Sequence, residues 1–152
     1  MSGIFGCAEK VSCLDTLFYG TDYHSHLGTR YGGVAVWGAE LQRKIHSIKG
    51  GLFKGKFYEE THDLSGNKGI GAISAGQEQP ICLNSRFGRL AIVTNGWIDN
   101  AEALAKGLLD RGHSFSEVRR GQINQTELVA KLINEGRTIV DGIENVFKCI
   151  DG

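Results

Sequence analysis

The sequence predicts a single domain of the α+β class, in which β-sheet is covered by helices. Short apolar, strand-like segments dominate its first two thirds, whereas its last third carries three amphipathic segments with helical spacing. Glycine is abundant, with 22 residues against one proline, which indicates tight turns and close backbone approaches rather than disorder. At 152 residues the chain is long enough to bury one core.

The first half of the chain is predicted to begin with a strand and a helix. Ser12 can cap this helix, in which Leu14, Leu17 and Phe18 share one face. A turn over residues 28–30 then leads to further strands, and the polar stretch 50–67 leaves room for one short helix. The glycines of the fourth strand suggest that another backbone or a ligand packs against it. The expected strands cover residues 3–8, 34–37, 41–48 and 69–74, and the expected helices cover about 12–27 and 57–62.

The second half contains the clearest strand and three helices. Residues 89–94 are apolar in a row, as in a strand buried on both faces, and they end at Asn95-Gly96, a strong turn dipeptide. Asn100 and Thr138 can cap two of the helices, which cover 101–109, 126–133 and a segment from 139 onward. On the last helix the residues expected to point inward are Ile139, Ile143, Val146 and Phe147. Since residues 148–152 could begin another strand, we expect the fold to be truncated at its C-terminus.

Composition narrows the class of function. Seventeen basic residues balance seventeen acidic ones, so no global field favours nucleic acid or an anionic membrane. No apolar run approaches the ~18 residues of a membrane span, and no signal peptide is apparent. Four scattered cysteines without a C-x-x-C pair fit reduced thiols in a cytoplasmic protein. The five histidines complete no metal-ligand spacing, so we expect no metal site.

The N-terminus carries the first candidate for catalysis. The chain opens Met1-Ser2-Gly3-Ile4-Phe5-Gly6, so removal of Met1 would give Ser2 both a nucleophilic oxygen and a free α-amine. Because that amine has an ordinary pKa of about 7.7–8.0, it can act as the general base for its own hydroxyl. An ordinary first strand with a flexible start remains the alternative on these residues alone.

Several separated motifs resemble class II glutamine amidotransferases, whose catalytic residue is N-terminal. Residues 2–6 resemble their Cys-Gly-Ile-Phe-Gly start, and residues 94–100 resemble their Asn-Gly-x-x-x-Asn segment. Residues 27–36 look like the family's Leu-Gln-His-Arg-Gly helix end and following strand. The matches from residue 69 onward are Gly69-Ile70-Gly71, Gln79-Pro80, His113 with Phe115, and Thr126-Glu127. The set keeps the family's order over most of the chain, and residues 19–29 favour the amidophosphoribosyltransferase branch.

The resemblance implies an α+β, four-layer αββα N-terminal-nucleophile hydrolase sandwich in which Ser2 attacks the side-chain amide of glutamine. The Asn95 side chain and the Gly96 N–H would form the oxyanion hole. Arg30 matches an arginine that supports the N-terminal residue. The alternatives are a helix-end charge for Arg30 and a plain hairpin turn for Asn95-Gly96. Cys7 is a weaker nucleophile candidate because it has no free amine.

Four departures from the family pattern bear on activity. Serine replaces cysteine at position 2, and a hydroxyl ionises far less readily than a thiol. While Met1 remains, Ser2 has an amide in place of an amine. Ser74 stands where the family has an arginine for the glutamine carboxylate, and Gln125 stands where an aspartate pairs with its ammonium group. Each lost charge-assisted bond is worth about 1.5–3 kcal/mol.

Two hypotheses follow from the resemblance. In the first, residues 1–152 are the partial glutamine amidotransferase type 2 domain of an amidophosphoribosyltransferase-like protein in purine biosynthesis, which hydrolyses glutamine weakly. In the second, the domain is catalytically silent and has a binding, regulatory or structural role. The implied partners are glutamine or a related small molecule, a phosphoribosyltransferase domain outside these residues, and further copies of the chain in a homo-oligomer. No cofactor is expected in this domain.

Overall fold

The computed structural model describes residues 2–27 and 30–152, and it divides the chain into two compact units. The first unit contains the residues up to Cys82 together with Ala91–Asn95. The second unit contains Leu83–Leu90 and Gly96–Gly152. Met1 and the predicted turn residues Gly28 and Thr29 lie outside the described residues.

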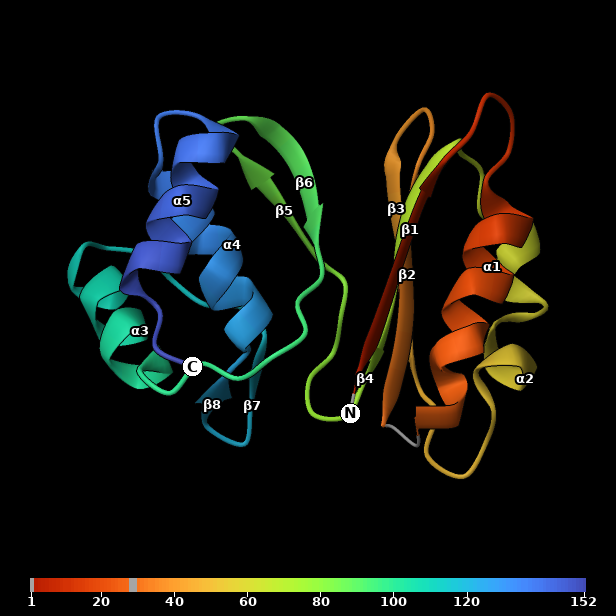
Figure 1. Ribbon diagram of the computed structural model, residues 1–152, viewed down its shortest axis with the longest axis horizontal. Helices are drawn as coiled ribbons and strands as arrows, with labels where there is room; N and C mark the ends of the chain where they lie inside the picture. Colours follow the sequence, from red (N-terminus) through yellow and green to blue (C-terminus); the bar gives the residue numbers. More distant parts are fainter. Residues whose placement is uncertain (1, 28–29) are drawn as a thin grey trace. The chain divides into compact units, whose positions relative to one another are not determined.

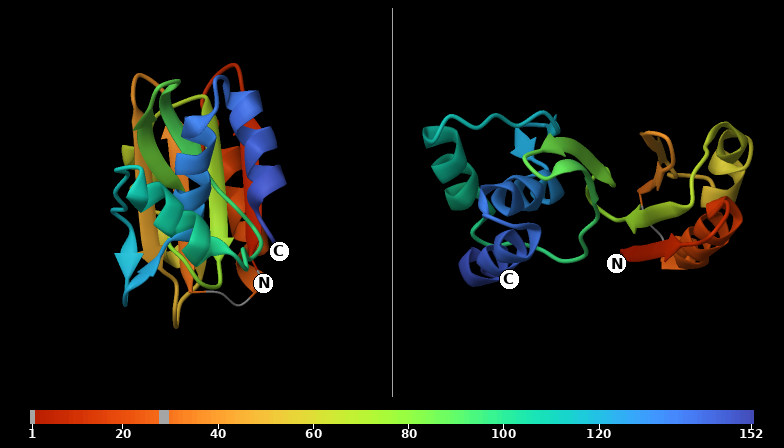
Figure 2. Two further views of the ribbon diagram at one scale, coloured as in Figure 1. Left: turned by 90° about the vertical axis from the view of Figure 1, so that its left-hand side faces the viewer. Right: turned by 90° about the horizontal axis from the view of Figure 1, so that it is seen from above.

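The first unit is built on a four-stranded antiparallel sheet with the strand order β1-β4-β2-β3. Its helical elements lie on one side of this sheet (Figures 1 and 2). The strands are β1 (Gly3–Ala8), β2 (Tyr31–Trp37), β3 (Leu41–Ser47) and β4 (Lys68–Ser74). The helices are α1 (Leu14–Asp22) and α2 (Phe53–Phe57), with the 3-10 segments η1 (Tyr23–Leu27) and η2 (Glu60–Asp63).

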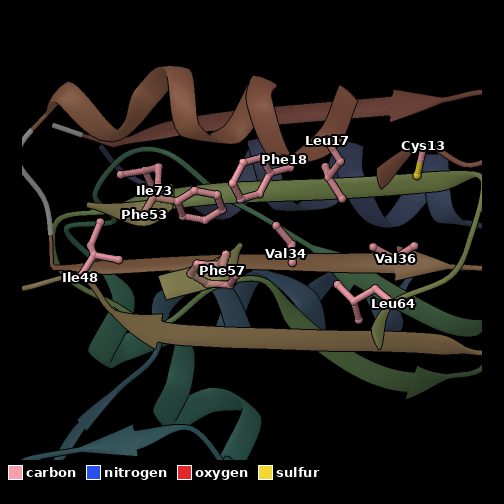
Figure 3. Close-up of a cluster of buried hydrophobic side chains, with 10 residues drawn as sticks. All are labelled: Cys13, Leu17, Phe18, Val34, Val36, Ile48, Phe53, Phe57, Leu64 and Ile73. Atoms are coloured by element: carbon pink, nitrogen blue, oxygen red, sulfur yellow. The ribbon is translucent and has the colours of Figure 1, made fainter. Parts of the chain in front are cut away.

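The core of the first unit lies between this sheet and its helices (Figure 3). Alternate residues of a strand face the same side, so Val34 and Val36 of β2 point together toward the helices. Phe53 and Phe57 of α2 stack at a ring-centroid distance of 4.2 Å, and both are fully buried. Burying side chains of this size contributes about 1.5–3 kcal/mol each.

Glycines on β4 allow α1 to approach the sheet closely. A Cβ atom on Gly69 would lie 2.5 Å from the Leu17 side chain, and one on Gly71 would lie 2.0 Å from Thr21 Oγ1. Real Cβ atoms do not come this near to other heavy atoms, so larger residues at these positions would push α1 outward. The glycines of this strand therefore serve helix packing, which accounts for the close approach that the sequence suggested.

The opposite face of β2 is covered at one point by the segment Gln79-Pro80. Gly33 lies on this face, and a Cβ atom there would lie only 1.9 Å from the main-chain oxygen of Gln79. Arg43 of β3 donates from Nη1 to the Pro80 carbonyl oxygen at 3.3 Å. The sheet thus carries helices on one side and a tightly held loop segment on the other.

The second unit consists mainly of three helices, and α4 and α5 lie side by side in it (Figures 1 and 2). They approach closely at Gly142, where a Cβ atom would lie 2.1 Å from the Ile133 carbonyl oxygen. The remaining described strands form two short pairs, β5-β6 and β7-β8. The residues of β5 and of β6 are divided between the two units. The helices are α3 (Ala101–Asp110), α4 (Gln125–Glu135) and α5 (Ile139–Cys149). The strands are β5 (Ile81–Ser85), β6 (Gly88–Ile92), β7 (Val118–Arg119) and β8 (Gln122–Ile123).

Most predicted elements are present, and several details of the prediction were wrong. Asn100 precedes α3 but makes no cap bond, because its side chain binds the Cys149 carbonyl and the Asp151 N–H. The strand predicted over 89–94 is only half-buried and ends at Ile92. The short helix expected over 57–62 is replaced by α2 and η2, and the strands β5, β7 and β8 were not predicted.

The inward face predicted for α5 was also wrong. Val146 is buried, but Ile139, Ile143 and Phe147 are exposed. Within the described residues, α5 meets α4 chiefly along the narrow side that carries Gly142 and Val146. The Thr138 cap was predicted correctly, since its hydroxyl accepts a hydrogen bond from Asp141 N.

All four cysteines carry free thiols, as the sequence predicted. None of the helices in the described part of the chain has the length and apolar character that crossing a membrane requires.

The close contact over Gly33 gives a first test. We expect Gly33→Ala to lower the free energy of unfolding by about 1–3 kcal/mol or more, because the added methyl group overlaps the Gln79 carbonyl. Urea unfolding of the purified protein measures this change. Gly55→Ala in α2 is the control, since its Cβ atom meets open space and alanine favours helix by about 1 kcal/mol. Equal effects of the two substitutions would contradict this packing.

Candidate active site at the Ser2 end of the sheet

Ser2 directly precedes β1, at the end of the sheet where β4 finishes. Gly3 pairs with Ile73 in the antiparallel register, so Ser2 comes next to Ser74 across the two strands. The Ser2 hydroxyl oxygen accepts a hydrogen bond from the Ala75 N–H at 3.2 Å. Sequence reasoning did not identify Ala75, because only the strand register brings its amide to Ser2.

Asn95 reaches the same residue from the other end of the sequence. Its Nδ2 donates to the Ser2 carbonyl oxygen at 3.3 Å, although the two residues are 93 positions apart. A carboxamide has two N–H donors, so one can hold Ser2 while the other can serve a substrate oxygen. The structure therefore brings together the nucleophile and the amide donor that the sequence proposed, and their catalytic roles stay a prediction.

Gly96 follows Asn95 with a positive φ of 150°, which residues with side chains rarely adopt. Both residues are exposed. After Gly96 the chain runs on through residues 97–100 into α3, so this dipeptide does not form the plain hairpin turn that was the alternative. The positive φ favours glycine at this position, and an added Cβ atom would meet nothing within 4 Å.

Ser74 is buried and engaged by its own loop. It is 3% exposed, and its hydroxyl accepts hydrogen bonds from Gln77 N at 3.1 Å and Gly76 N at 3.4 Å. This arrangement is typical of a serine that ends a strand and shapes a turn. Its side chain thus stabilises the start of the loop that supplies Ala75.

Arg30 lies at the same end of the sheet through its main chain. Its N–H donates to the Ser74 carbonyl at 3.0 Å, and its carbonyl accepts from Ile48 N at 2.9 Å. The residue is exposed and precedes β2 without belonging to a helix. No contact of its guanidinium group decides between the helix-end alternative and support of Ser2 in the described residues, so both stay predictions.

Gln125 belongs to the second unit, where it is paired with main chain. Its Oε1 accepts from Ile98 N at 3.0 Å, and its Nε2 donates to Ile98 O at 3.3 Å. This two-bond pairing imitates a β-sheet contact and fixes the chain shortly after Gly96. The amide at this position therefore has a local structural role.

Glu127 is a buried carboxylate that sequence reasoning matched to the family but gave no role. It is 4% exposed, and it accepts hydrogen bonds from the N–H groups of Ser116 and Glu117 and from the Ser116 hydroxyl. The Lys131 Nζ atom lies 3.4 Å from Glu127 Oε1. Burial raises the pKa of Glu127, but these hydrogen bonds and the lysine lower it more, so the pKa lies below its ordinary value.

Other titratable groups fit catalysis less well. Burial, with Cys13 close by, raises the pKa of Cys7 to about 11, so this thiol is almost entirely protonated near neutral pH. His46 and Glu60 form a separate pair with 2.5 Å between Nε2 and Oε2. In residues 2–27 and 30–152, histidine, cysteine and acidic side chains form no group of three that could hold a metal ion.

Two solved structures share the fold of the whole chain. A structure described as the allosteric regulatory enzyme of purine biosynthesis matches with a TM-score of 0.83 at 24% identity, covering 100% of this chain and 34% of that one. The glutamine phosphoribosylpyrophosphate amidotransferase from B. subtilis, complexed with ADP and GMP, matches with a TM-score of 0.81 at 24% identity, covering 100% and 33%. These likenesses show that the chain shares the fold of this part of both structures, in agreement with the predicted α+β class.

Sequence comparison assigns the family. A family model described as a glutamine amidotransferase domain matches residues 69–152, which is more than half of the chain. The chain therefore belongs to the glutamine amidotransferase domain family. It is 30% identical over 164 aligned positions to the amidophosphoribosyltransferase of Methanocaldococcus jannaschii, covering 100% of this chain and 34% of that protein. The resemblance to the glutaminase domain of amidophosphoribosyltransferases is confirmed, and the chain spans about a third of the length of these relatives.

The lowered pKa of Glu127 predicts an acid-sensitive contribution to stability. A carboxylate with a lowered folded-state pKa stabilises the protein fully above its ordinary value of 4.5, and that stability is lost as the pH falls through the folded-state pKa. We expect Glu127→Gln to lower the free energy of unfolding at pH 7 by about 1.5–3 kcal/mol.

Urea unfolding at several pH values measures this difference, which should shrink on acidification below pH 4.5. The exposed Glu102→Gln in α3 is the control, with an expected change within about 0.5 kcal/mol. A difference that does not vary with pH would show that the Glu127 charge is not the cause.

Proposed function

We propose that this chain is a glutamine-hydrolysing domain whose nucleophile is Ser2, exposed by removal of Met1. The observation that carries the proposal is the hydrogen bond from Asn95 Nδ2 to the Ser2 carbonyl oxygen at 3.3 Å. It joins the main chain of the residue that carries the N-terminal hydroxyl to the asparagine of the Asn-Gly pair, and such a hydrolase needs both parts, for attack and for charge stabilisation.

The first step forms an acyl-enzyme. The free Ser2 amine takes the hydroxyl proton while Oγ attacks the side-chain carbonyl carbon of glutamine. The carbonyl oxygen becomes an oxyanion, to which the second N–H of Asn95 and the Gly96 N–H can donate. The protonated amine then gives its proton to the leaving nitrogen, the carbon–nitrogen bond breaks, and ammonia departs.

The second step hydrolyses the acyl-enzyme and regenerates the free enzyme. The Ser2 amine takes a proton from water, and the resulting hydroxide attacks the ester carbonyl carbon. The ester bond to Oγ breaks, Oγ regains a proton from the amine, and glutamate leaves. The Ala75 N–H donates to Oγ at 3.2 Å, which stabilises negative charge on this oxygen and fixes its position for both steps.

Serine makes this reaction slow compared with cysteine. A hydroxyl is a much weaker acid than a thiol, so the amine must remove its proton as the new bond forms. The reaction also depends on removal of Met1. While Met1 is present, the Ser2 nitrogen is part of a peptide bond and cannot act as a base. We therefore propose weak turnover that appears only after Met1 has been removed.

A silent binding or regulatory module is the second candidate, and two observations favour it. The Ser74 hydroxyl is committed to the Gly76 and Gln77 amides, and the Gln125 carboxamide is paired with Ile98. Neither position has a charge with which to hold the carboxylate or ammonium group of glutamine. A domain of this kind could retain its fold while having lost efficient use of free glutamine.

The relatives suggest the wider setting. An amidophosphoribosyltransferase and a phosphoribosylpyrophosphate amidotransferase are both about three times the length of this chain. We propose that the ammonia released here passes to a phosphoribosyltransferase domain in purine biosynthesis, and that the assembled protein is a homo-oligomer located in the cytoplasm.

The test combines processing with turnover. After mass spectrometry has shown the state of the N-terminus, glutamate release from glutamine is measured for the natural chain, Ser2→Cys and Ser2→Ala. We expect slow release by the processed natural chain, faster release by Ser2→Cys and none by Ser2→Ala. Asn95→Ala should reduce the rate by roughly 10²–10³-fold, since it removes one oxyanion donor.

Circular dichroism and thermal unfolding should show that all four proteins are folded, so that a loss of rate reflects chemistry. Release by Ser2→Ala equal to that of the natural chain would exclude Ser2 as the nucleophile. Processed, folded Ser2→Cys protein without any turnover would instead favour the silent module.

A further inference from the structure

Gln79 is a buried polar residue that connects the sheet to the candidate oxyanion donor. It is 6% exposed, and its Oε1 accepts a hydrogen bond from the Thr94 N–H at 2.8 Å. Thr94 immediately precedes Asn95, so this bond fixes the main chain one residue before the side chain that contacts Ser2. The two partners are 15 positions apart, and the contact therefore depends on tertiary structure.

The main chain of Gln79 is itself held firmly against the sheet. Its carbonyl oxygen lies over Gly33 of β2, where a Cβ atom would be only 1.9 Å away. Arg43 of β3 holds the neighbouring Pro80 carbonyl at 3.3 Å. A side chain that starts from such a fixed point loses little further freedom when it forms its hydrogen bond.

The loop that contains Gln79 also contacts Ser2. This loop begins at Ser74, whose hydroxyl caps Gln77 N, and its Ala75 N–H donates to Ser2 Oγ. One short segment thus holds the nucleophilic oxygen at its beginning and the chain before Asn95 at its end.

We infer that Gln79 is a positioning residue that sets the Asn95 carboxamide relative to Ser2. The inference rests on the proposed function for its catalytic consequence, although the anchoring itself can be measured without turnover. Gln79 does not touch the reacting atoms. It acts through Thr94, whose main-chain position determines where the Asn95 side chain begins.

The anchoring is tested by amide hydrogen exchange in the full chain. Gln79→Leu removes the acceptor while keeping a side chain of similar size, so exchange of the Thr94 N–H should accelerate by about tenfold or more. Exchange of the core residue Ile73 should not change, which would show that the fold is intact. Unchanged exchange at Thr94 would overturn the inference, whatever the activity assay shows.

The catalytic consequence is tested in the Ser2→Cys background, where glutamate release is expected to be faster. Gln79→Leu should lower kcat by about 10- to 100-fold with KM within about twofold, because the oxyanion donor acts mainly in the transition state. Gln79→Glu keeps an oxygen acceptor and should restore most of the rate. A change confined to KM, or no rescue by Gln79→Glu, would overturn the positioning role.

A double-mutant cycle shows whether the effect passes through Asn95. Combined with Asn95→Ala, the Gln79→Leu change should cost no more than about a further twofold, whereas fully additive losses would contradict coupling. Gln42→Leu in β3 is the matched control, because Gln42 Oε1 likewise accepts a main-chain N–H, from Ser65 at 2.9 Å, and Gln42 pairs with Val36 near the end of β2 remote from Gly33. If the Ser2→Cys protein shows no turnover, the proposed function fails, and the exchange of Thr94 alone decides this inference.

Discussion

Close approach to the sheet at three glycines is the constraint on which the first unit depends. Gly69 and Gly71 face the helix side, where Leu17 and Thr21 of α1 occupy the space that Cβ atoms would take. Gly33 faces the opposite side and receives the Gln79 carbonyl. A side chain at any of these positions would separate a covering layer from the sheet, and dispersion contacts decline steeply when a packed layer moves outward. The glycine content of the chain is therefore a packing feature in this unit as much as a turn feature.

The candidate site lies at the end of the sheet where β1 begins and β4 finishes. The antiparallel register brings the start of β1 beside the end of β4, so the N-terminal hydroxyl meets the first amide of the following loop. The same loop then crosses β2 at Gly33 and places Gln79 where it can hold Thr94. Asn95 completes the arrangement by binding the Ser2 carbonyl. A series of hydrogen bonds between side chains and main-chain groups thus connects sheet packing to the geometry of two residues that are distant in sequence.

Much of the fold could be predicted because local signals were strong where packing agreed with them. Residues 3–8 and 69–74 were identified closely by their apolar and small residues, and α5 by its Thr138 cap. Hairpins β5-β6 and β7-β8 were missed in whole or in part, since their strands are short and partly polar. The exposure of Ile139, Ile143 and Phe147 on α5 could not be predicted. Helical spacing indicates which residues share a face, but it does not indicate how much of that face a neighbouring element covers.

For the site, residue types in order were enough to propose that Ser2 and Asn95 meet, but they could not reveal what holds them. Ala75 contributes only a main-chain N–H, which every residue except proline has, so its identity gives no signal. Gln79 acts on a residue 15 positions away, and the sequence does not indicate which main-chain group a buried glutamine will bind.

Ser74 and Gln125, which depart from the family pattern, both form hydrogen bonds that stabilise the main chain near them. Ser74 satisfies two loop amides from a buried position, so a long charged side chain there would leave those amides without their present acceptor. Gln125 binds both polar groups of Ile98, and an aspartate could accept from the N–H but could not donate to the carbonyl. Simple reversion at either position would therefore disturb local structure while it restored a charge. By contrast, Ser2 and Asn95 are held by the Ala75 N–H, by the Asn95 carboxamide on the Ser2 carbonyl and by Gln79 on the Thr94 N–H, and none of these contacts involves position 74 or 125 through a charge. If Ser2 and Asn95 have the roles proposed above, the arrangement that would break the amide bond does not require charges at positions 74 and 125.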